Sequence, residues 1–209
     1  MSLIFKFLFS QYASYPTSDI ILEITAVFFG FLSVWYSKQN KLWVFPTGMI
    51  STSIFVYLLL KWQLLGDMLI NAYYFAMSIY GWHVWTNKTT KTQLTPISTS
   101  NYYEKKLSIV IFIASLLFVY TIYLFFDKWN GWTAYVDTLT TAIFFVGMWL
   151  MAKRKIENWL FWIVGDFISV PLYFYKGLSF TSIQYLIFTF MAITGYLAWK
   201  KNLNNKLLI

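Results

Sequence analysis

The chain has 209 residues, of which 59% are hydrophobic, 23% are aromatic and only 11% are charged. Soluble globular domains carry about 25% charged residues, so this composition excludes an ordinary water-soluble domain. A core of this size cannot bury so much apolar surface, and the remainder has to face lipid. The sequence contains no cysteine and one histidine, His83, so no metal or cofactor is expected. We predict an all-α polytopic membrane protein.

Seven apolar stretches have the length of roughly 20 residues that a bilayer core requires. In chain order they cover residues 19–38, 43–60, 67–86, 105–126, 133–153, 157–175 and 181–200. Residues 1–18 form a short apolar and aromatic segment that cannot span a bilayer, and we expect it to lie at the membrane interface. Residues 201–209 are left as a polar tail. The sequence therefore predicts seven transmembrane helices.

The 16 Lys and Arg residues are divided unevenly between the two ends of these helices. One end has Lys6, Lys61, Lys128 and Lys176. The other end has Lys38, Lys41, Lys88, Lys91, Lys105, Lys106, Lys153, Arg154, Lys155, Lys200, Lys201 and Lys206. Because basic loops stay in the cytoplasm, the N-terminus is predicted outside the cell and the C-terminus in the cytoplasm. The net charge of +8 thus reflects topology, and it implies no nucleic-acid partner.

The three stretches before the fourth one resemble the three that follow it. The spacing of Glu23 and Trp35 is repeated by Asp137 and Trp149. Further matches pair Trp43-x-x-Pro46 with Trp159-x-x-Trp162, Tyr57 with Tyr173, and the series Asp67, Gly81, Trp85 with the series Thr181, Gly195, Trp199. These matches predict two three-helix units, over residues 19–86 and 133–200.

The fourth predicted helix has no counterpart in this comparison. It belongs to residues 87–132, which also contain a polar connector on the cytoplasmic side. Two consecutive three-helix units would face opposite ways, and one helix between them restores a parallel orientation. A 3+1+3 parallel repeat is a transporter architecture, in which the cargo site lies near the midplane between the repeats.

Aromatic and acidic residues inside the stretch 157–175 point to a binding site. Trp159, Trp162 and Asp166 share one helix face, because residues three and four apart are neighbours. Indole faces attract flat cations, and each contact is worth about 0.5–2 kcal/mol when it is desolvated. A carboxylate at the bilayer centre costs about 2.5–3.5 kcal/mol on insertion scales and needs a partner or a cavity. A cationic aromatic cargo would supply that partner, while interfacial placement and interhelical bonding are the structural alternatives.

Two amides lie at similar depths in the third helix of each unit. Asn71 and Gln184 are polar groups that need partners when buried, and these partners are either the cargo or a neighbouring helix. We assign both to the cargo site. Further residues that could line a path are Ser53, Tyr57, Tyr74, Ser169, Tyr173 and Tyr185, with packing roles as the alternative.

Several catalytic signatures are missing from the sequence. There is no G-x-x-x-x-G-K-[ST] phosphate loop, no Ser/His arrangement within a span and no mid-span lysine for a retinal-type Schiff base. The chain is therefore expected to be a solute carrier and not an enzyme. A membrane enzyme or receptor remains the minor alternative.

A family resemblance is carried by two runs in the second unit, ENWLFWIVGDFISVPLYF and LSFTSIQYLIFTFMAITGYLAW. The first unit adds LWVFPTGMISTSIFVYLLLKWQLLGDMLINAYYFAMSIYGWHVW. Over residues 19–199 the chain resembles the PnuC family of bacterial vitamin transporters. The resemblance implies a seven-helix fold in the bacterial inner membrane, related to a duplicated SWEET unit, and a homo-oligomer.

The same resemblance implies a cargo and a mechanism. Nicotinamide riboside, a precursor of NAD, would enter by facilitated diffusion, and a cytoplasmic vitamin kinase would trap it by phosphorylation. Family members that carry thiamine offer the alternative cargo, and both vitamins are small cationic heteroaromatic molecules. Asp166 stands where the family often has Asn, which leaves the choice between them open.

Overall fold

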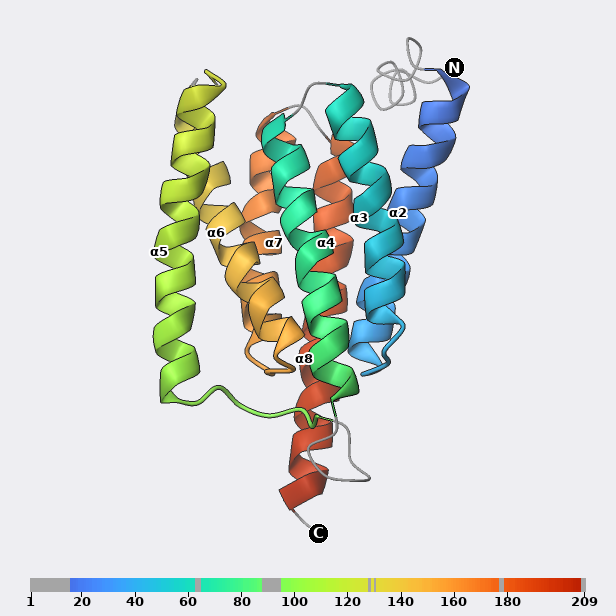
Figure 1. The fold of residues 1–209 in the computed structure, drawn as a ribbon, viewed down its shortest axis with the longest axis vertical. Coiled ribbons are helices and arrows are strands. Elements are labelled where there is room, and N and C mark those ends of the chain that lie inside the picture. The colour runs from blue at the N-terminus through green and yellow to red at the C-terminus, as the bar shows by residue number, and fades with distance from the viewer. Residues whose placement is uncertain are drawn as a thin grey trace.

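The computed structural model describes residues 16–62, 65–87, 95–127, 129, 131–176 and 179–207. Within these ranges the helices run side by side along one long axis, and α2 begins at the end opposite to that where α8 ends (Figure 1). The seven described helices are α2 Thr17–Lys38, α3 Val44–Lys61, α4 Leu65–Thr86, α5 Tyr102–Phe125, α6 Trp132–Ala152, α7 Asn158–Tyr175 and α8 Ser179–Leu207. We call the end of the bundle at which α8 ends the C-terminal end.

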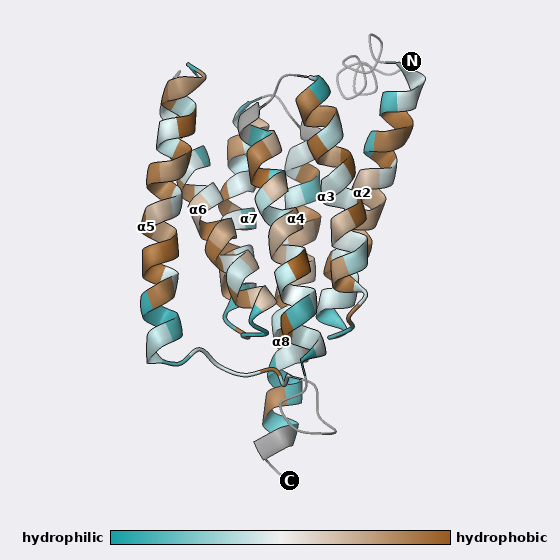
Figure 2. Cartoon of the chain, viewed as in Figure 1, coloured by the Kyte–Doolittle hydropathy of each residue, from teal (hydrophilic) through white to brown (hydrophobic). Residues whose placement is uncertain are grey.

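All seven predicted helices are present, and five are long and apolar enough to cross a membrane. These five are α2, α3, α5, α6 and the part of α8 over Thr181–Asn205. The remaining two, α4 and α7, carry the Asn, Asp, Trp and Tyr residues that lower mean hydropathy. Figure 2 shows α5 as hydrophobic over most of its length, and its exposed side chains include Leu107, Ile109, Val110, Ile113 and Leu117. Such a face requires an apolar solvent.

The largest difference from the predicted boundaries is at the C-terminal end of the chain. Helix α8 continues to Leu207, so the predicted polar tail over 201–209 is helical as far as the structure describes it. Lys200, Lys201 and Leu203 are good helix formers, so the sequence does not end the helix at residue 200. Of the predicted interfacial segment 1–18, only residues 16–18 are described, and Thr17 already begins α2; the remainder lies outside the described residues.

Helices α2, α3 and α4 form the first group of three helices, and α6, α7 and α8 form the second. Equivalent positions in the two groups are separated by a constant number of residues. Asn40 and Arg154, which are 114 residues apart, both have positive φ, at 58° and 60°, in the turns after α2 and α6. The same spacing relates the first residues of α3 and α7 and those of α4 and α8. It pairs Phe45 with Trp159, whereas the sequence comparison had paired Trp43 with Trp159. That pairing was wrong by two residues, because it was based on shared tryptophans; Trp43 is 62% exposed and precedes α3.

At the C-terminal end of the bundle, two tryptophan side chains form hydrogen bonds between the two groups of helices. Trp85 of α4 donates from Nε1 to the Met151 carbonyl of α6 at 3.1 Å. Trp199 of α8 donates from Nε1 to the Ser37 carbonyl of α2 at 2.9 Å. Both carbonyls belong to the last helical turn, and each also accepts a bond from a backbone N–H of the following turn, Arg154 for Met151 and Asn40 for Ser37. Helix α4 thus packs on α6, and α8 packs on α2.

Arg154 adds a further contact at the same end. Its Nε donates to Asn40 Oδ1 at 2.8 Å, and its Nη1 donates to the Thr95 carbonyl. The guanidinium carbon lies 4.3 Å from the centroid of the Trp85 ring. Burial lowers the pKa of Arg154 to about 10, so the side chain remains charged at neutral pH. This residue joins the turns of both groups and the connector that follows α4.

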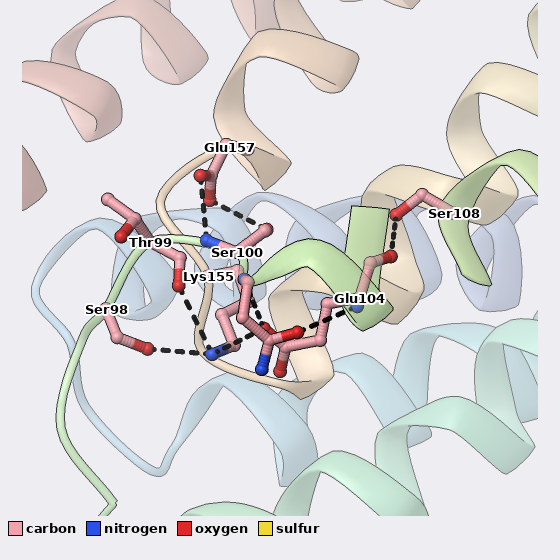
Figure 3. Close-up of polar contacts among 8 residues, drawn as sticks. Ser98, Thr99, Ser100, Glu104, Ser108, Lys155 and Glu157 are labelled. Carbon is pink, nitrogen blue, oxygen red and sulfur yellow. Dashed lines mark hydrogen bonds and ion pairs between the residues drawn. The ribbon is translucent and has the colours of Figure 1, made fainter. Parts of the chain in front are cut away.

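The connector before α5 is held against the turn between α6 and α7 (Figure 3). Lys155 Nζ lies 3.0 Å from Ser98 Oγ and 2.9 Å from Glu104 Oε2. Glu157 accepts from the Ser100 backbone N–H at 2.8 Å and from the Ser100 hydroxyl at 3.0 Å. The described part of the connector, from residue 95 to the start of α5, is therefore held against the turn between α6 and α7.

Ion pairs tie the first and second helices together at the opposite end. Lys61 lies 2.7 Å from Asp19, and Lys176 lies 2.6 Å from Asp137. The sequence comparison matched Asp137 with Glu23, but the equivalent ion pair in the first group is made by Asp19, one turn earlier on α2. Exposed ion pairs contribute little to stability, although Asp19 is only 2% exposed.

Candidate functional site

A cavity of about 260 Å³ lies between the two groups of helices. Its described lining comes from α2, α3 and α4 on one side and from α6, α7 and α8 on the other. Helix α5 contributes no described lining residue and packs mainly on the outer side of α6. The cavity therefore lies where two matching helix groups meet, as a cargo site between repeats would.

The structure brings all five predicted site residues to the wall of this cavity, namely Asn71, Trp159, Trp162, Asp166 and Gln184. Their role in binding remains a prediction. Of the other path candidates, Tyr74 and Tyr185 also line the cavity. Ser53 and Tyr57 are exposed instead, and Ser169 and Tyr173 are not among the lining residues.

An aromatic wall is formed by the second group of helices. The rings of Phe144 and Trp162 are stacked, with centroids 5.4 Å apart and an interplanar angle of 27°. Tyr185 lies nearly parallel to Phe144 at 6.1 Å. Offset stacking of this kind holds rings in fixed positions. Sequence reasoning missed Phe144, because a phenylalanine in an apolar helix carries no signal that separates binding from packing.

Trp159 is placed differently from Trp162. It is only 2% exposed, and its ring meets the Trp199 ring edge-on, at 5.6 Å and 88°. A Cβ atom at Gly195 would lie 2.5 Å from Trp159 Cη2, so the indole closely approaches the α8 backbone. Trp162 is therefore the better placed of the two to stack on a bound molecule.

Asp166 is a buried carboxylate, 4% exposed, on the cavity wall. Within the described part of the chain, no side chain donates a hydrogen bond to it or forms an ion pair with it. The described lining residues include no Lys or Arg. Tyr74 and Tyr185 lie close enough to interact electrostatically with it. A cation in this cavity would supply the charge partner that a buried carboxylate needs.

The opposite wall of the cavity carries small residues. At the spacing that relates the two groups, Gly30 corresponds to Phe144 and Gly48 to Trp162. The packing is reversed between the groups: a Cβ atom at Gly165 would lie 2.3 Å from Phe144, and one at Gly30 would lie 3.2 Å from Ser51 Oγ. Large aromatic side chains thus line one side of the cavity, and glycines with closely packed serine hydroxyls line the other.

Hydroxyl groups accompany these glycines. Ser33 donates to the Val44 carbonyl at 2.8 Å, and Ser51 donates to the Ala26 carbonyl at 2.7 Å. Ser78 likewise donates to a carbonyl of its own helix at 2.9 Å. Since each hydroxyl has a single hydrogen, these side chains offer only acceptor lone pairs to the cavity. Sequence reasoning missed them as well, because serine in a membrane helix is an ordinary packing residue.

Comparison with known proteins agrees with this architecture. Over 205 residues the chain is 23% identical to the nicotinamide riboside transporter PnuC of Escherichia coli K12. The alignment covers 85% of this chain and 84% of the E. coli protein. Over 177 residues it is 25% identical to the riboflavin/roseoflavin transporter RibM of Streptomyces davaonensis. That alignment covers 81% of this chain and 80% of RibM.

The fold is also similar to a solved structure, described as the crystal structure of the vitamin B3 transporter PnuC. The TM-score is 0.65 at 20% identity, with 95% of this chain and 89% of the other chain covered. The family model described as nicotinamide mononucleotide transporter matches residues 20–201. The chain therefore belongs to this family of PnuC-type membrane transporters and is not an enzyme.

Proposed function

We propose that the protein takes up nicotinamide riboside across the bacterial inner membrane by facilitated diffusion. A cytoplasmic vitamin kinase then traps the cargo by phosphorylation. The observation that carries the proposal is the buried Asp166 carboxylate, which lines the cavity beside the stacked Phe144 and Trp162 rings. Nicotinamide riboside is a flat pyridinium cation, so the rings serve its π-face and the carboxylate its charge.

Two amide side chains, Asn71 and Gln184, can form hydrogen bonds with the uncharged polar groups of the cargo. Asn71 lines the cavity, and its Nδ2 donates to the Asp67 carbonyl at 3.0 Å, which leaves its Oδ1 as an acceptor. Gln184 lines the cavity from α8. A carboxamide and ribose hydroxyls match such groups, whose hydrogen bonds contribute about 0.5–1.5 kcal/mol each.

Thiamine is the second candidate, and the same observation favours it. Its thiazolium ring is also a flat cation, so Asp166 and Trp162 would serve it equally well. RibM is named as a transporter of riboflavin, whose ring system is neutral and offers a carboxylate no charge partner. Asp166 therefore favours a cationic vitamin over a flavin.

The architecture fits alternating access. We propose that residues 19–86 and 133–200 are parallel three-helix repeats of a duplicated SWEET-like unit, joined by residues 87–132, and that all seven helices span the membrane. The constant spacing and the paired indole contacts support this assignment. Rocking of one repeat against the other would expose the cavity to each side in turn. The N-terminus is placed outside, the C-terminus in the cytoplasm, and the protein forms homo-oligomers.

Flux into empty proteoliposomes tests the function. Labelled nicotinamide riboside should enter vesicles until inside and outside concentrations are equal, without ATP or an ion gradient. Vesicles containing a riboside kinase and ATP should continue to accumulate label. Absence of entry, or entry that depends on a sodium or proton gradient, would contradict facilitated diffusion of this cargo.

A further inference from the structure

Four buried rings close the C-terminal end of the cavity. Phe45 and Trp85 belong to the first group of helices, Trp159 and Trp199 belong to the second, and none of them is more than 2% exposed. Phe45 meets Trp85 edge-on at 5.0 Å, and Trp159 meets Trp199 edge-on at 5.6 Å. Trp85 and Trp199 join the two pairs, with ring centroids 5.9 Å apart. The rings therefore block this end until the two groups separate.

Arg154 joins the two groups next to these rings. Its guanidinium carbon lies 4.3 Å from the centroid of the Trp85 ring, its Nε donates to Asn40 Oδ1 at 2.8 Å, and its Nη1 donates to the Thr95 carbonyl. Asn40 and Arg154 are equivalent positions, 114 residues apart. Equivalent positions can meet only near the axis that relates the two groups. The Arg154–Asn40 pair thus ties the groups together at the centre of their interface.

The connector that precedes α5 takes part in the same closure. Thr95 Oγ1 donates to the Val84 carbonyl of α4, in the first group, at 2.8 Å. Ile97 is 6% exposed and packs in one apolar cluster with the four rings. The Ser98 backbone N–H donates to the Arg154 carbonyl, in the second group, at 3.2 Å. Separation of the groups at this end therefore has to break the contacts of Arg154 and withdraw Ile97.

The contacts of Arg154 favour a closure that can be reversed. Arg154 is 6% exposed, its acceptors are neutral oxygens of Asn40 and Thr95, and within the described ranges no carboxylate forms an ion pair with it. A buried charge without a counter-ion is costly, and it regains hydration when water reaches it. Ser37 Oγ and Asn158 Oδ1, buried at the same end, also have no hydrogen-bond partner among the described residues. Hydration of these groups offsets the contacts that opening breaks.

We propose that Arg154, Asn40 and the connector residues 95–98 form a latch that holds the C-terminal end of the cavity closed, and that release of this latch opens the cavity toward the cytoplasm. This inference rests on the proposed function and deepens it. It assigns the conformation described above as closed toward the cytoplasm, and it gives the connector a part in the rocking of the two groups.

Thiol labelling tests the latch without any cargo. The chain contains no cysteine, and Ser37→Cys places a single thiol at the closed end, at a residue that is 2% exposed. The exchange sacrifices no hydrogen bond of the serine hydroxyl to the described residues. A membrane-impermeant maleimide, added to everted membrane vesicles, should label this thiol only while the C-terminal end is open. In this background Arg154→Gln should raise the labelling rate about 10-fold or more, because hydrogen bonds from a buried cation are lost.

Asn40→Asp should have the opposite effect. It turns the hydrogen bond from Arg154 into a charge-assisted pair, and aspartate tolerates the positive φ of 58° at this position. Labelling of the reporter thiol should therefore slow about fivefold or more. Lys41→Gln is the matched control, because it removes one positive charge beside Asn40 from an exposed side chain. Its labelling rate should stay within about twofold of the parent.

Unchanged labelling in Arg154→Gln or in Asn40→Asp, or an equal rise in Lys41→Gln, would overturn the latch. Melting temperatures show whether each variant is folded. If Arg154→Gln does not fold, Asn40→Gly removes the acceptor instead and suits the positive φ, and it has to raise the labelling rate for the latch to stand. Absence of riboside flux in the wild type would refute the proposed cargo, whereas the labelling rates decide on the latch independently of any cargo.

Discussion

At the scale of single residues, the lining of the cavity depends on which positions carry a large side chain and which carry glycine. Phe144 and Trp162 stack because Gly165 and Gly147 let them approach the helix backbones. At the corresponding positions Gly30 and Gly48 let the hydroxyls of Ser51 and Ser33 approach instead. A pair of similar helix groups thereby encloses an asymmetric cavity, with rings on one wall and hydroxyl groups on the other.

Trp162→Ala should weaken cargo binding by about 1–3 kcal/mol, because a ring contact and its buried area are both lost. Trp43→Ala is the control: Trp43 belongs to the motif that the sequence matched with Trp159-x-x-Trp162, yet it is 62% exposed and outside the cavity lining. Both variants should be titrated after purification. Normal affinity in Trp162→Ala would place the ring site elsewhere.

The site was largely predictable where residues contrast with their surroundings. Asp166, Asn71 and Gln184 are polar groups in apolar stretches, so their cost in lipid made them visible. Phe144 and Gly48 show no such contrast. Their significance comes from the pairing of the two helix groups in space, which no single stretch of sequence contains.

At the scale of elements, the helices are fixed by apolar length and by contacts at their ends. Asn101 and Glu104 form a capping box at the start of α5, with both hydrogen bonds at 2.9 Å. Lengths of apolar stretches predicted the helices well, but matched tryptophans gave the wrong register for the second helix of each group. The positive φ values at Asn40 and Arg154 mark equivalent positions in the two groups, and aligning these two residues gives the register of the second helices.

The reciprocal indole contacts lead to a stability prediction. Trp85→Phe and Trp199→Phe should each lower the free energy of unfolding by about 1–3 kcal/mol, because a buried hydrogen bond between the two groups and part of a buried ring are lost. Trp132→Phe, at a residue that is 52% exposed, should have little effect. Melting temperatures of the purified variants provide the comparison. Equal shifts for all three would mean that the two indole N–H groups contribute nothing specific.

At the scale of the whole molecule, the distribution of charge along the bundle predicts one orientation in the membrane. Basic residues concentrate at the C-terminal end of the bundle, and α2 begins at the other end (Figure 1). A cytoplasmic reporter fused after Ile209 should be active, and a periplasmic reporter at the same position should be silent, as the distribution of Lys and Arg requires. An active periplasmic reporter there would reverse the topology and contradict the seven-span arrangement.

The central claim is that the cavity binds a cationic vitamin through Asp166. Calorimetric titration of the wild-type protein and of Asp166→Asn with nicotinamide riboside, thiamine and riboflavin tests it most directly. We predict micromolar or tighter binding of nicotinamide riboside to the wild type, and a loss of about 1–3 kcal/mol in Asp166→Asn, because a buried charge-assisted contact is removed. Thiamine binding alone would change the cargo and keep the cationic site. Undiminished binding in Asp166→Asn, or a preference for neutral riboflavin, would contradict the claim.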